Sequence, residues 1–190
     1  MLIQATRRYF LGHSATGVLS VAAVGLLSGV ATGTQAQSMD ASKDVSILNV
    51  ALGLEHEAIN AYQLGAGSNL LQKGALDVAV LFQSHHKAHR DALIATIEKM
   101  GGKPVMEKSL ADYAKALGAD GLKSQTDVLM LAAKLELGAV NAYLGVIPAF
   151  KDAKLAQIAG RLASDETMHW TALRGALAQA LPVGALSFGA

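Results

Sequence analysis

Two parts of the chain repeat one another at a nearly constant spacing, and this repeat limits the possible folds more than any other feature. Residues 54–62 (LEHEAINAY) align with residues 135–143 (LELGAVNAY), which places Glu136 81 residues after Glu55. Residues 84–93 (SHHKAHRDAL) align with residues 164–173 (SDETMHWTAL) at a spacing of 80 residues. Two matches at almost the same spacing indicate two copies of a helical hairpin related by a pseudo-two-fold axis. Such hairpins pair into a closed four-helix bundle.

The rest of the chain also predicts an all-α protein. No stretch alternates apolar and polar residues with the period of a strand, so a sheet is not expected. We predict long helices over residues 44–64, 68–100, 124–147 and 151–181, because glycines or prolines stand near their ends. A short helix is expected between Ser109, a good N-cap residue, and Gly118. The connection over residues 101–123 is long enough to cross over the bundle.

Six ionisable residues fall where apolar side chains should form the core. Each long helix carries an apolar stripe at the three- and four-residue spacing of one helix face. Each stripe is interrupted in its middle by carboxylates or imidazoles, so all four helices point ionisable groups toward a common interior. The six residues are Glu55, His86, His89, Glu136, Glu166 and His169.

A bound cation is the simplest reason for this arrangement. A lone buried carboxylate costs several kcal/mol unless it is neutralised or paired, and several carboxylates close together repel. A divalent ion pairs directly with their oxygens, and histidine adds a neutral nitrogen ligand. The alternative is that Glu55 and Glu136 are structural carboxylates paired with Arg90 or Arg161.

At these residues the sequence resembles the ferritin-like family, and specifically the bacterial ferritin-like domain proteins that carry a twin-arginine export signal. The metal pattern of that family has one Glu on each of two helices and Glu-x-x-His on each of the other two. The single glutamates correspond to Glu55 and Glu136. The resemblance implies a di-iron-carboxylate type of four-helix bundle that holds a divalent transition metal, with iron ahead of manganese, zinc and copper.

The second Glu-x-x-His motif departs from the family pattern. Glu166 and His169 match one copy, but His86 and His89 occupy the other, so His86 replaces a glutamate. This removes one bridging carboxylate and favours a single ion or an asymmetric pair. His85 lies four residues before His89 and is a candidate to assist or replace His86. Asp165, its counterpart in the repeat, is a candidate to support a ligand.

Residues near the six candidates carry separate expectations. His56 and Glu57 are expected to face solvent, and the same holds for His85 if it does not assist the centre. Tyr62 and Tyr143 lie seven residues past the two glutamates of their own helices, about 10 Å along the axis at 1.5 Å per residue. That distance is too long for ligation, so both tyrosines are expected to pack in the core.

The first 36 residues differ from the rest and resemble an export signal. Arg7 and Arg8 are followed by Phe10-Leu11, then by a weakly apolar run rich in glycine and serine, and Thr34-Gln35-Ala36 offers small residues at a cleavage site. The paired arginines resemble a twin-arginine signal, which implies the twin-arginine export machinery as a partner and a periplasmic or otherwise exported location in a bacterium. We therefore expect a signal over residues 1–36, a bundle domain over residues 37–190, and no stable membrane span after cleavage. A retained membrane anchor is the alternative.

The amino-acid composition excludes several classes of function. The chain has no cysteine, so disulfides, cysteine-ligated metals and thiol catalysis are excluded. Its formal net charge of +1 and its 5% aromatic content give no basic surface or stacking platform, so no nucleic-acid partner is expected. We expect an exported metal-binding protein, with a mono- or dinuclear oxidoreductase acting on oxygen, peroxide or metal ions as the leading function. The alternative is a non-catalytic envelope stress or desiccation-type bundle, or an interaction scaffold. A homodimer is left open.

Overall fold

The computed structural model describes residues 33–189, and within them every regular element is helical. The elements are α1 (Gly33–Gly67), α2 (Lys73–Lys99), α3 (Leu110–Leu117), η1 (Ala119–Gly121), α4 (Gln125–Val146), η2 (Ile147–Ala149) and α5 (Ala153–Ala176). Most of the expected export signal lies outside the described residues. Only residues 33–36 of that segment are described, and they form the beginning of α1.

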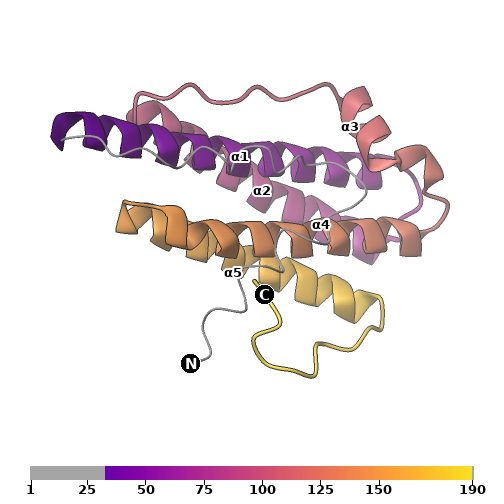
Figure 1. Cartoon of the computed structure of the whole chain (residues 1–190). Helices are drawn as coiled ribbons and strands as arrows, with labels where there is room; N and C mark the ends of the chain where they lie inside the picture. Colours follow the sequence, from indigo (N-terminus) through magenta and orange to yellow (C-terminus); the bar gives the residue numbers. More distant parts are fainter. Residues whose placement is uncertain (1–32, 190) are drawn as a thin grey trace.

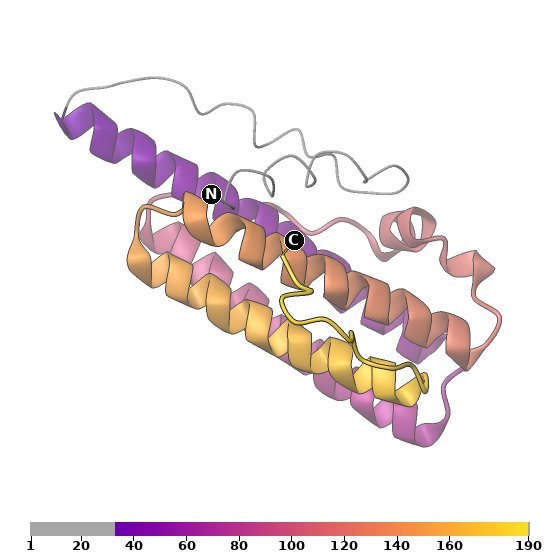
Figure 2. The same cartoon turned by 60° about the horizontal axis from the view of Figure 1, so that its bottom comes forward.

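The four long helices form one bundle of two hairpins, which confirms the predicted fold class (Figure 1). α1 pairs with α2, α4 pairs with α5, and α1 also packs against α4. Figures 1 and 2 show α4 running opposite to α1, and α5 running opposite to α2. This reversal is the arrangement that a two-fold axis perpendicular to the bundle produces, as the internal repeat predicts.

Helix ends differ from the sequence prediction at three places. α1 begins at Gly33 rather than near residue 44. α2 begins at Lys73 rather than at Ser68, because Asn69 adopts a positive φ of 59° and turns the chain between the two helices. α5 ends at Ala176 rather than near residue 181, because Ala178 takes a left-handed conformation with φ 52°.

The predicted short helix and its caps are confirmed. The Ser109 hydroxyl accepts a hydrogen bond from the Asp112 backbone N–H at the start of α3. Gly118, with φ 65°, ends α3 in the left-handed conformation that glycine adopts most readily. Ser124 caps α4 in the same way as Ser109 caps α3.

The connection from α2 to α3 runs along part of α1, where it contacts residues from Asn49 to Asn60 (Figure 1). Asn49 on α1 holds it with two hydrogen bonds, one to the Lys103 carbonyl at 3.1 Å and one from the Val105 N–H at 2.7 Å. His56 Nε2 lies 3.3 Å from the Val105 carbonyl oxygen. His56 is 4% exposed, so the expectation that it faces solvent is wrong. Its ring fastens the crossover to α1.

Two apolar clusters fill the bundle on either side of its middle. The first contains Leu48, Leu52, Leu93, Ile97, Tyr143, Leu155 and Leu162, among other residues. The second contains Tyr62, Ala79, Phe82, Leu129, Ala133, Trp170 and Leu173. The six ionisable residues lie between these clusters in every helix, so the polar centre has apolar residues on both sides along the bundle axis.

One helical stretch in the described part of the chain has the length and hydropathy of a membrane span. It covers Gln125–Ala149, that is, α4 and η2. This stretch packs against α1 and α5 and carries Glu136, which is 2% exposed inside the bundle. A core helix of a globular bundle has these same properties.

Candidate metal centre

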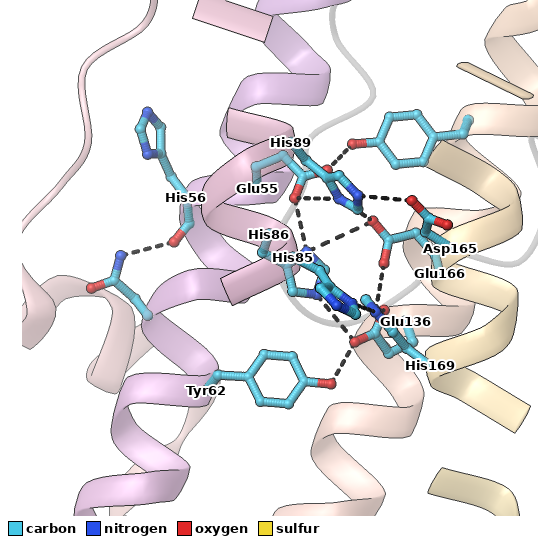
Figure 3. Close-up of polar contacts among 12 residues, drawn as sticks. Glu55, His56, Tyr62, His85, His86, His89, Glu136, Asp165, Glu166 and His169 are labelled. Atoms are coloured by element: carbon cyan, nitrogen blue, oxygen red, sulfur yellow. Dashed lines mark hydrogen bonds and ion pairs between the residues drawn. The ribbon is translucent and has the colours of Figure 1, made fainter. Parts of the chain in front are cut away.

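All six predicted residues meet in the middle of the bundle (Figure 3). Glu55 comes from α1, His86 and His89 from α2, Glu136 from α4, and Glu166 and His169 from α5. Five of them are at most 2% exposed, and His89 is 8% exposed. They form two overlapping groups whose ligand atoms lie within 4.8 Å of one another: one contains Glu55, His86, His89 and Glu166, and the other contains His86, Glu136, Glu166 and His169.

His86 stands between the two groups and uses both ring nitrogens. Its Nδ1 lies 2.8 Å from Glu55 Oε2, and its Nε2 lies 3.2 Å from Glu136 Oε1. Glu166 also faces both groups. One of its oxygens lies 3.3 Å from His89 Nδ1, and the other lies 3.1 Å from His169 Nδ1. The residue that replaces a family glutamate is therefore at the centre of the site.

Two tyrosines reach the carboxylates of the opposite hairpin. The Tyr62 hydroxyl on α1 donates to Glu136 Oε1 on α4 at 2.5 Å, and the Tyr143 hydroxyl on α4 donates to Glu55 Oε1 on α1. A helical side chain leans toward the N-terminus of its helix, so each ring extends back toward the middle of the bundle. Sequence reasoning measured only the distance along one helix and missed this contact. The repeat itself was the available signal, because both copies carry the tyrosine at the same position.

Two further side chains orient the histidine rings. His89 Nε2 lies 3.1 Å from Asp165 Oδ2, and His169 Nε2 lies 2.9 Å from His85 Nδ1. In each case the other ring nitrogen, Nδ1, faces the carboxylates of the centre. Metal-binding histidines commonly make this kind of outer hydrogen bond, which fixes the ring and its tautomer. Asp165 thus has the supporting contact expected for it, and His85 supports His169 rather than entering the centre.

The structure also tests the prediction for Glu57 and the alternative that arginines pair with the two glutamates. Glu57 is 9% exposed, so the expectation that it faces solvent is wrong. The alternative of arginine pairing for Glu55 and Glu136 is not what the structure shows, because both contact histidines and Arg90 pairs with Asp91 at 2.8 Å. Trp170 is buried in the second apolar cluster.

Charge in the centre is shared between three carboxylates and three imidazoles. Burial alone would raise the pKa of Glu55 and Glu136, but the neighbouring histidines outweigh it and lower both pKa values. For Glu166 burial prevails, and its pKa is raised. Burial would lower the pKa of His89, but the carboxylates of Glu166 and Glu55 raise it to about 10. The carboxylates likewise raise the pKa of His86 and of His169. Without an ion, protons on the histidines balance the carboxylates.

The donor set fits a metal ion. The test is whether buried ligand atoms of the centre lack a good hydrogen bond within the protein. His89 Nδ1, Glu136 Oε2 and Glu166 Oε1 are buried and make no hydrogen bond of good geometry, although His89 Nδ1 lies 3.3 Å from Glu166 Oε1 and His169 Nδ1 lies 3.4 Å from Glu136 Oε2. These three belong to the six central residues, and the two other buried atoms of this kind in the described part of the chain are His56 Nδ1 and Arg174 Nε. Metal–nitrogen and metal–oxygen bonds are about 2.0–2.2 Å long, so ligands of one ion lie no more than about 4.4 Å apart. A cation in the first group would face His89 and Glu166, and a cation in the second group would face Glu136 and Glu166.

This fold and this centre define a class: four-helix bundle proteins with a buried carboxylate–histidine cluster at the junction of two repeated hairpins. The model of the ferritin-like domain family matches residues 43–179, and the chain belongs to that family. Among solved structures, a conserved hypothetical protein, rv2844, from Mycobacterium tuberculosis is similar with a TM-score of 0.63 and 21% sequence identity. That match covers 77% of this chain and 97% of the other, and it supports the fold alone. No curated protein sequence matches the chain significantly.

Proposed function

We propose that this chain is an exported metal-binding protein whose buried centre holds one or two divalent transition ions, iron ahead of manganese, zinc and copper. Six buried carboxylate and imidazole side chains that converge in two overlapping groups support the proposal, and three of their ligand atoms, on His89, Glu136 and Glu166, make no hydrogen bond of good geometry. Each such atom costs about 1–3 kcal/mol if it stays unsatisfied. Three such atoms among buried carboxylates and imidazoles are costly for a purely structural network and are expected for an ion site.

The residues that would hold the ion follow from the two groups. Glu166 can serve both groups, because each of its carboxylate oxygens faces a different histidine. His86 is more restricted, since a neutral imidazole has only one free lone pair. If each of its two nitrogens bound an ion, the neutral ring would have to lose its remaining N–H proton. The centre therefore favours one ion, or two ions of unequal affinity.

The leading activity is that of an oxidoreductase acting on oxygen, peroxide or metal ions. A bound iron or manganese ion would supply the change of oxidation state that such a reaction needs. The chain itself supplies a buried site, three carboxylates to hold the positive charge, and two tyrosine hydroxyls that stabilise the carboxylates from the outside. It also holds protons on its histidines, which metal binding would release.

One observation favours the alternative, a non-catalytic envelope stress or desiccation-type bundle or scaffold. His86 contacts both Glu55 and Glu136, so a protonated ring neutralises part of their charge without any ion. Metal binding without turnover of oxygen or peroxide would select this alternative.

Export through the twin-arginine route rests on Arg7 and Arg8 and on the small residues that end at Ala36. That route would carry the bundle after folding, which suits a protein that takes up its metal inside the cell. Cell fractionation of the wild-type chain and of a variant with both arginines changed to lysine tests this proposal. We expect the variant to be retained in the cytoplasm.

Metal analysis tests the centre directly. Protein purified without chelator should contain about one or two equivalents of transition metal, and Glu166→Gln should lose most of it. Glu98→Gln is the matched control, because Glu98 is an exposed residue of α2 outside the centre. Less than half an equivalent in the wild-type protein, with no uptake on incubation with Fe²⁺, Mn²⁺ or Zn²⁺, would contradict the proposal.

A further inference from the structure

An apolar cavity of about 330 Å³ leads from one end of the bundle to the polar centre. All four long helices contribute to its lining. Along α4 the lining residues extend from Gln125 to Ala139, which is roughly 20 Å at 1.5 Å per residue. The inner end is formed by Tyr62, His86 and Glu136. The cavity is not sealed, because its lining residues Gly74 and Val78 are exposed.

The cavity exists because small residues occupy positions where larger side chains would fill a bundle. Alanines line it from every long helix, for example Ala58 on α1, Ala79 on α2, Ala132 on α4 and Ala176 on α5. The cavity ends where the helices come close together. A methyl group added to Gly65 would lie 2.9 Å from Val128 Cγ1.

The wall of the cavity is apolar along most of its length and favours an uncharged ligand. No lysine, arginine or aspartate is among the lining residues. Three of the polar side chains belong to the inner end, and Gln125 is occupied by a 2.8 Å hydrogen bond from the Gln72 N–H. Only Glu57 adds a further carboxyl group, and it is 9% exposed. Away from Glu57 and the inner end, a charged group would therefore find no partner along the wall.

We propose that this cavity binds an uncharged, mostly aliphatic molecule and places one end of it against His86 and Glu136. The volume lies in the range of small-molecule sites, about 300–1,000 Å³, and is roughly twice the 150 Å³ of an apolar cavity that holds benzene. Its length and its uninterrupted apolar wall fit a single flexible chain. The idea that this molecule is the substrate of a metal centre rests on the proposed function, but the binding itself does not.

Calorimetric titration with 1-decanol tests the proposal, with decanoate and decylamine as charged probes of the same length. We expect 1-decanol to bind with one site per chain, and each charged probe to bind at least tenfold more weakly. Nuclear Overhauser contacts should connect one end of the bound chain to the rings of His86 or Tyr62, and that readout needs no metal.

Two cavity-filling variants, Ala132→Leu and Ala58→Leu, should each weaken 1-decanol binding at least tenfold. Ala95→Leu is the matched control, because Ala95 is an exposed residue of α2 that does not line the cavity. Thermal unfolding and circular dichroism of all three establish that they fold. Equal binding of decanoate, unchanged affinity in both filled variants, or no binding up to the solubility of 1-decanol overturns the inference.

The titration is run on chelator-treated and on metal-loaded protein, which separates this inference from the proposed function. If metal binds and 1-decanol does not, only the cavity assignment fails. If 1-decanol binds at the cavity and no metal is taken up, the cavity assignment holds and the metal centre fails.

Discussion

The Tyr62 hydroxyl on α1 donates a 2.5 Å hydrogen bond to the Glu136 carboxylate on α4. Its counterpart in the repeat, Tyr143, makes the same bond back to Glu55. Each hairpin thus stabilises the carboxylate of the other hairpin, and the two halves of the bundle are joined by polar contacts as well as by apolar packing. Both rings also belong to the apolar clusters that flank the centre, Tyr62 to one and Tyr143 to the other.

Removing either hydroxyl should weaken the centre without opening a cavity. Tyr62→Phe and Tyr143→Phe each remove a buried hydrogen bond to a charged group, which is worth about 1.5–3 kcal/mol. We expect a loss of this size in the free energy of unfolding by urea, and weaker metal binding. Tyr113→Phe is the control, since its hydroxyl only accepts a 3.3 Å bond from the Lys108 N–H at the surface side of the crossover. Equal losses in all three variants would show that the two tyrosines have no special relation to the carboxylates.

The His86→Glu substitution should restore the family pattern and change the metal stoichiometry. A fourth carboxylate at this position would supply the second bridge that two divalent ions need. We expect metal uptake to rise to two equivalents, and the metal-free protein to become less stable, because four buried carboxylates then repel. Binding is measured by calorimetric titration after chelator treatment, with His86→Gln as the control of similar size. If the wild-type centre already binds two ions of equal affinity, the argument from the single imidazole lone pair is wrong.

The fold and the six central residues could be predicted from the sequence because the evidence for them is periodic. The evidence consists of a repeat, helix-spaced apolar stripes and ionisable residues within those stripes. None of these patterns depends on the exact residue at which a helix begins or ends. The boundaries themselves depend on local backbone conformations, such as the positive φ of Asn69 and Ala178, which neither residue type requires.

The tyrosine contacts, the burial of His56 and the burial of Glu57 could not be predicted in the same way. His56 depends on where the crossover runs, which is a tertiary contact with Val105. Glu57 lies at a cavity that only the packing of four helices creates. The tyrosines reach across to another helix, and spacing within one helix does not report on that distance.

The metal-free protein should lose stability as pH rises above neutrality. The pKa values of His86, His89 and His169 are raised in the fold, to about 10 for His89, against about 6.5 for an unfolded chain. Their contribution is therefore complete below about pH 6.5 and is lost as pH rises through the folded pKa values. The slope is about 1.4 kcal/mol per pH unit for each proton that only the folded site retains.

The carboxylates determine how the stability of the metal-free protein changes at acidic pH. The lowered pKa values of Glu55 and Glu136 give stability above about pH 4.5 that is lost as pH falls through their folded pKa values. The raised pKa of Glu166 works in the opposite sense, because its contribution is present at low pH and is lost as pH rises. Urea unfolding in the presence of EDTA should thus show a maximum between about pH 5 and 6.5. Saturating Zn²⁺ should remove the alkaline decline, and a metal-free stability that is flat from pH 6.5 to 9 would contradict the assigned proton balance.

Two glycine substitutions test the packing of the bundle without touching the centre. A methyl group at Gly102 would lie 2.5 Å from Val45 Cγ1 and 3.0 Å from Ile97 Cγ2, and β-branched side chains cannot easily move aside. We expect Gly102→Ala to cost about 1–3 kcal/mol, the usual cost of overpacking. Gly138 on α4 has no atom within 4 Å of such a methyl group, so Gly138→Ala should stabilise the fold by about 0.5–1 kcal/mol through helix propensity. Both effects are measured by urea unfolding, and a stabilising Gly102→Ala would show that the start of the crossover does not pack against α1 and α2 as described.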